Sequence, residues 1–94
     1  MKTAGYIKLI EEFIKKNISI EEFEHMFNRV FEKDSERHSE EVFHILNRLF
    51  ADIDSYLPEC RPEDETNIAP YDISEQTLRK YAAVALEKLN AALM

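Results

Sequence analysis

Residues 42–57 read VFHILNRLFADIDSYL, and their apolar side chains return every three or four positions. That spacing places them on one face of an α-helix, because the helix completes a turn every 3.6 residues or so. The side chains expected to face inward are Val42, Ile45, Leu46, Leu49, Phe50, Ile53, Tyr56 and Leu57. Pro58 should end this helix, since the residue before a proline disfavours helical geometry. The stretch predicts an amphipathic helix with one face on a core.

The remainder of the chain carries three more apolar stripes at helical spacing. The first helix is expected over residues 3–16, the second from residue 20 onward, and the fourth after residue 74. The inward side chains are expected to be Tyr6, Leu9, Ile10, Phe13 and Ile14 in the first helix, Ile20, Phe23, Phe27, Val30 and Phe31 in the second, and Leu78, Tyr81, Ala82, Ala85, Leu86, Leu89, Ala92 and Leu93 in the fourth. Ser19 with Glu22 predicts a capping box at the start of the second helix, and Ser74 predicts the cap of the fourth.

Four stripes joined by short first connections predict an all-α fold, an antiparallel four-helix bundle. The 94 residues suit a single helical domain over residues 1–94. The connection of residues 58–73 holds all three prolines of the chain and is long for a bundle. Connections of that kind are usually functional or disordered. The expected architecture is therefore a bundle with a long acidic loop between its third and fourth helices.

Charge and composition exclude several function classes. A net charge of −7 argues against binding to nucleic acid or to an anionic membrane and favours a basic partner. The single cysteine excludes an intrachain disulfide and fits a reducing, cytoplasmic compartment. No stretch approaches the roughly 18 apolar residues of a membrane span, and no signal peptide is expected at the N-terminus.

The acidity is local. Residues 52–75, called the acidic segment below, contain eight carboxylates and one base, and acids and bases balance in the rest of the chain. One interpretation is a solvated loop that keeps the protein soluble. The alternative is a stiff acidic surface that attracts a basic protein and imitates the phosphates of a nucleic acid. Within it, Tyr71 is either an interface anchor or a loop-packing residue, and Tyr56 is favoured as core.

Catalysis and metal binding find little support. Glu22 with His25 and Glu41 with His44 form two Glu-x-x-His pairs, but helical phase turns all four side chains away from the apolar stripes. Cys60 has acidic neighbours that would suppress its thiolate. The carboxylates of the acidic segment lack the spacing and glycine of an EF-hand. We therefore expect no enzyme and no cofactor.

Three stretches, YIKLI at residues 6–10, ISIEEFE at 18–24 and LFADIDSY at 49–56, resemble the colicin D-type immunity protein family. The resemblance covers nearly the whole chain. It implies a small cytosolic helical bundle that forms a 1:1 complex with a toxin, a nuclease that cuts tRNA. Acidic side chains of the inhibitor would then replace the RNA in the basic active site. The positions that match the family pattern are Asp52, Asp54, Tyr56, Glu59 and Asp72.

The predicted toxin-binding residues are Asp52, Asp54, Tyr56, Glu59, Glu63, Asp64, Glu65, Tyr71 and Asp72. A loop that departs from the colicin D relative leaves a different nuclease or activity open for the toxin. Two other classes stay open on the residues alone. One is a helical adaptor that binds a protein through its first two helices, with a merely solvated acidic loop, and the other is a small metal-binding enzyme.

Overall fold

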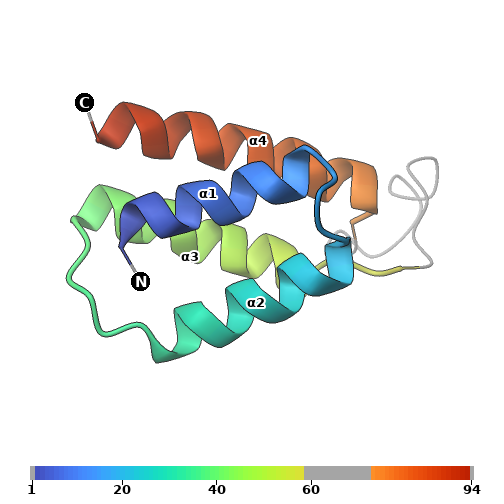
Figure 1. Cartoon of the computed structure of the whole chain (residues 1–94), viewed down its shortest axis with the longest axis horizontal. Helices are drawn as coiled ribbons and strands as arrows, with labels where there is room; N and C mark the ends of the chain where they lie inside the picture. The colour runs from blue at the N-terminus through green and yellow to red at the C-terminus, as the bar shows by residue number, and fades with distance from the viewer. Residues whose placement is uncertain (1, 59–72, 94) are drawn as a thin grey trace.

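The computed structural model describes residues 2–58 and 73–93. These residues form four helices, α1 (Thr3–Ile14), α2 (Ile20–Lys33), α3 (Glu40–Asp54) and α4 (Glu75–Ala92). Each helix runs antiparallel to the one before it, so that α4 lies along both α1 and α3 (Figure 1). The predicted all-α four-helix fold is confirmed. Most of the predicted loop between α3 and α4 lies outside the described residues.

The core is built from the predicted stripes. Its fully buried large side chains come from all four helices and include Tyr6, Ile10, Phe13, Phe23, Phe27, Leu46, Leu49, Ile53, Leu78 and Leu89. Aromatic contacts join α1 to α2: the rings of Phe13 and Phe23 stack with centroids 4.2 Å apart, and Tyr6 lies 5.7 Å from Phe27. Burial of apolar side chains is the dominant favourable term in folding, and each of these rings contributes a large buried area to it.

Three side chains at the ends or edges of the stripes were predicted to face inward and do not. Leu57 and Leu93 are exposed because α3 and α4 end before them, at Asp54 and Ala92. Tyr81 is exposed at the edge of its stripe. Its neighbours Ala82 and Ala85 fill the inward positions of α4. Small residues at these positions allow close helix packing, which leaves a bulky ring at the edge of the interface.

Helix α1 ends two residues earlier than predicted. Lys16 adopts a left-handed backbone conformation with φ of 64°. Its N–H donates to the carbonyl of Phe13, and the Asn17 N–H donates to the carbonyl of Glu12. This pair of bonds is a Schellman motif, which usually has glycine at the left-handed position. Helix propensity predicted the longer helix because no glycine marked this end.

Serine caps begin the other three helices. The predicted capping box is present, with the Ser19 side chain and the Glu22 side chain each accepting from the other residue's backbone N–H. The Ser39 hydroxyl accepts from Val42 N, and the buried Ser74 hydroxyl accepts from Thr77 N, as predicted for the fourth helix. Each cap satisfies a backbone donor that the helix itself leaves without a partner.

The two ends of the connection between α3 and α4 are held side by side. Beyond the last turn of α3, the Leu57 N–H donates to the carbonyl of Ile73 at 3.1 Å. The Ile73 N–H donates in turn to the carbonyl of Ser55 at 3.0 Å, so that Tyr56 and Ile73 form an isolated parallel bridge. The chain leaves the helix here before Pro58, which therefore does not determine where α3 ends.

Candidate functional site

The structure describes three of the nine predicted toxin-binding residues, and all three lie at the C-terminal end of α3. Asp52 and Asp54 occupy its last turn, and Tyr56 follows in the bridge to Ile73. The other predicted residues lie outside the described residues, as does Cys60; they are Glu59, Glu63, Asp64, Glu65, Tyr71 and Asp72.

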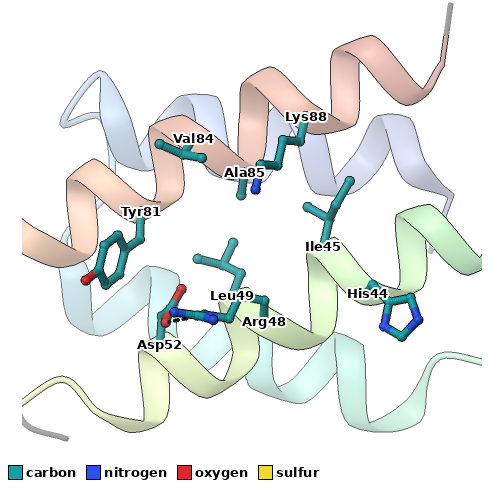
Figure 2. A pocket seen from close by; sticks show the side chains of 9 residues that line it. All are labelled: His44, Ile45, Arg48, Leu49, Asp52, Tyr81, Val84, Ala85 and Lys88. Atoms are coloured by element: carbon teal, nitrogen blue, oxygen red, sulfur yellow. Dashed lines mark hydrogen bonds and ion pairs between the residues drawn. The ribbon is translucent and has the colours of Figure 1, made fainter. Parts of the chain in front are cut away.

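Asp52 points from α3 toward α4 (Figure 2). Its side chain is only 13% exposed, and its Oδ1 accepts from the Nε of Arg48 at 3.3 Å, one helical turn earlier. Burial raises the pKa of Asp52, and the Arg48 guanidinium opposes that rise. A second positive charge beside this partly desolvated carboxylate would further stabilise its ionised form, and a basic partner could provide that charge.

Asp54 is exposed on the last turn of α3, and this turn contains no basic residue. A helix C-terminus carries a partial negative charge, so carboxylates there are electrostatically unfavourable. Glu40 and Glu41 lie in the first turn of α3, where negative charge is favourable, whereas Asp52 and Asp54 lie in the last turn, where it destabilises the helix. Solvent exposure leaves Asp54 free to meet a cation from another molecule.

Tyr56 is half-buried and packs against the core, as its predicted preference for the core indicates. The backbone bridge to Ile73 fixes its position. The structure therefore supports Tyr56 as a residue that secures the base of the acidic segment, with part of its ring accessible.

A groove of about 430 Å³ between α3 and α4 was not predicted. Asp52 lies at one end of it with Tyr81, and Lys88 lies toward the other end (Figure 2). The exposed position of Tyr81 is the feature of α4 that periodicity failed to identify. The position of Tyr81 at the margin of the apolar stripe was the sequence feature that could have indicated its exposure.

A buried polar cluster was also missed. The Tyr6 hydroxyl donates to Asp34 Oδ2 at 2.6 Å, and the His38 Nε2 donates to the same oxygen at 2.9 Å. Thr3 Oγ1 lies 3.3 Å from His38 Nδ1. Asp34 and His38 come from the polar connection between α2 and α3, which has no hydrophobic pattern, so their burial at 5% and 7% exposure could not be foreseen. The cluster ties this connection to α1.

These contacts change the acidity of the cluster. Burial and the neighbouring Asp34 raise the pKa of Tyr6. Burial opposes ionisation of Asp34, but the hydrogen bonds that its carboxylate accepts, among them those from Tyr6, His38 and the backbone of Glu36, lower its pKa. The cluster is a structural feature at the end of the bundle opposite to Asp52 and Asp54 (Figure 1).

The two Glu-x-x-His pairs face solvent, as predicted: Glu22, His25, Glu41 and His44 are all exposed. Within residues 2–58 and 73–93, no group of three or more His, Cys, Asp or Glu side chains is arranged to hold a metal ion. None of the helices in the described part of the chain is long and apolar enough to cross a membrane.

The described residues form a small all-α unit of four antiparallel helices, with Asp52 and Asp54 at one end. Residues 1–89 match the family described as bacterial self-protective colicin-like immunity, and the chain belongs to this family. Comparison with curated proteins and with solved structures gives no match. Proteins of the family are not enzymes, and each neutralises a cognate colicin; the partner of this chain is therefore a colicin.

Proposed function

We propose that this protein, as a single helical domain in the cytoplasm of the producing cell, covers the basic active site of a tRNA-cleaving colicin in a 1:1 complex. The acidic segment takes the place of the RNA phosphates. The contact residues are the nine predicted ones: Asp52, Asp54, Tyr56, Glu59, Glu63, Asp64, Glu65, Tyr71 and Asp72.

The distribution of charge carries this proposal. The acidic segment alone accounts for the whole net charge of −7. Its base is anchored, because the Tyr56–Ile73 bridge and the buried cap at Ser74 hold the described ends of the connection together. A localised negative field speeds association with a basic protein, to about 10⁸–10⁹ M⁻¹s⁻¹ at low salt, and selects its orientation.

The placement of Asp52 and Asp54 supports the same conclusion. Both carboxylates stand at the negative end of the α3 dipole, and the burial of Asp52 adds a further cost. Residues that lower the stability of the free protein are typical of binding surfaces, where function and stability oppose each other. A cationic active site facing these two residues would reverse both effects.

Calorimetry with the toxin domain of the cognate colicin tests the proposal. The double variant Asp54→Lys with Glu59→Lys should lose at least about 3 kcal/mol of binding free energy, since like charges would then face each other. The matched control, Glu32→Lys with Glu36→Lys, makes the same charge change near the opposite end of the bundle, where both residues are exposed. It should bind within about 1 kcal/mol of the parent.

A ribonuclease assay on tRNA completes the test. The parent protein and the control should abolish cleavage at a 1:1 ratio, and the Asp54–Glu59 variant should not. Nanomolar binding by that variant would refute the proposed surface. The helical adaptor interpretation predicts that shuffling the acidic segment leaves partner binding intact.

A further inference from the structure

The groove between α3 and α4 adjoins the acidic segment but has a different chemistry. Its floor is apolar, formed by Leu49 and Ala85, which are buried, and by Ile45, which is half-buried. Tyr81 and Val84 rise from α4 at 38% and 45% exposure. Exposed apolar side chains gathered in a groove are typical of a protein-binding site, whereas scattered ones are not.

The rim of the groove is cationic away from Asp52. Lys88 has no ion-pair partner in the part of the chain that the structure describes, and its side chain extends over the groove (Figure 2). Arg48 also lines the groove, and its one described partner is Asp52. The lining of the groove thus carries two cations against one carboxylate, in contrast to the acidic segment that begins at Asp52. An occupant of the groove is therefore expected to carry an acidic group next to an apolar one.

We infer that this groove receives an apolar side chain of the cognate colicin, flanked by a carboxylate that pairs with Lys88. The inference rests on the proposed function, because it places a second contact of the same complex next to Asp52. Asp52 and His44 are eight residues apart on α3, so the groove extends about 12 Å along the helix. That length accommodates one anchor side chain and its charged neighbour.

The two contacts have different roles. An acidic surface attracts any protein with a cationic active site, and charge alone discriminates poorly between such proteins. A cationic, apolar groove at a fixed distance from Asp52 and Asp54 rejects a toxin that presents a base there and accepts one that presents an acid. Specificity of this kind needs a repulsive element as well as an attractive one, and Lys88 supplies it.

Calorimetry of the protein with the toxin domain of the cognate colicin tests the inference through two matched pairs of variants. Val84→Arg fills the groove with a charged chain, and Ala83→Arg adds the same chain at an exposed position of α4 outside it. Lys88→Glu reverses the rim charge, and Lys80→Glu makes the same change at another exposed position of α4. We expect Kd to rise about thirtyfold or more for Val84→Arg and Lys88→Glu, and less than about threefold for each control.

The Asp54→Lys and Glu59→Lys double variant separates the two proposals. If it loses binding while the groove variants bind like their controls, the groove inference is overturned and the proposed function stands. If neither set weakens binding, both are overturned and the colicin contacts another face. The four substitutions in α4, at Lys80, Ala83, Val84 and Lys88, are all at exposed positions. Unchanged helical circular dichroism and thermal midpoints will show that a variant that loses binding has kept its fold.

Discussion

Asp34 accepts hydrogen bonds from Tyr6 and His38, and so connects α1 with the polar link between α2 and α3. A carboxylate at 5% exposure is costly unless its oxygens are satisfied, and here Oδ1 also accepts from the Glu36 N–H at 2.9 Å. The contacts stabilise the ionised form of Asp34 in the folded state. Stability should consequently depend on this one residue in a pH-dependent way.

The prediction at this scale concerns Asp34→Asn. Because the folded-state pKa of Asp34 lies below its usual value near 4, its stabilising contribution is complete above that value and is lost as pH falls through the folded-state pKa. Parent and variant should therefore differ most in free energy of unfolding at pH 6–7, and the difference should begin to shrink as the pH falls below about 4. Urea unfolding followed by circular dichroism at several pH values measures the difference.

Glu36→Gln is the matched control for this series, since Glu36 is an exposed acid in the same connection. It should keep the pH dependence of the parent. An Asp34→Asn variant whose deficit stays constant from pH 7 to pH 3 would contradict the assigned pKa shift of Asp34.

At the scale of the element, α3 combines a structural face with a binding end. Its inward side chains Leu46, Leu49 and Ile53 are fully buried, while its last turn carries acids against the helix dipole. Removing the charge of Asp54 should therefore make the free protein more stable and the complex weaker. Few surface positions are expected to have opposite effects of this kind.

Asp54→Asn is the corresponding prediction. We expect the free energy of unfolding to rise by about 0.3–1 kcal/mol, because a negative charge leaves the C-terminus of the helix. The control Glu41→Gln removes a charge from the first turn of the same helix and should lower stability by a similar amount. Urea denaturation at low ionic strength measures both. Destabilisation by Asp54→Asn would show that Asp54 has a stabilising partner.

At the scale of the molecule, concentrated charge acts on folding and on binding in opposite directions. The longest dimension is 38 Å, comparable with the Debye length of about 30 Å at 0.01 M salt. At low salt the field of the acidic segment therefore reaches most of the protein and its surroundings. Self-repulsion lowers stability there, and attraction to a basic colicin is strongest there.

Raising the salt concentration from 0.01 M to 0.15 M, which shortens the Debye length to about 8 Å, should stabilise the free protein and weaken its colicin complex. Urea unfolding and calorimetry at matched salt concentrations measure the two effects. The Asp54→Lys and Glu59→Lys variant should show a smaller salt dependence of binding than the parent. A colicin affinity that is indifferent to salt would count against an electrostatic interface.

The four helices, most of their inward faces and the two predicted caps at Ser19 and Ser74 follow from local rules, so the fold class could be predicted from the chain. Period, cap and charge density depend on residues close together in the sequence, such as Ser19 with Glu22 or the stripe from Val42 to Ile53. The same rules identified a clustered acidic segment beginning at Asp52. They failed where α1 ends, because a lysine occupies the left-handed position that glycine usually marks.

The groove and the Asp34 cluster depend on residues that are far apart in the chain. Tyr81 lies beside Asp52, and Lys88 lies farther along the same groove, only because α3 and α4 pack antiparallel. Tyr6 meets Asp34 only because α1 packs antiparallel to α2, which brings Tyr6 next to the C-terminal end of α2. No periodic pattern in the sequence predicts these contacts, because they are set by helix packing and by the path of the connections. Local patterns therefore define the helices and the site of negative charge, whereas packing between helices creates the surface beside it.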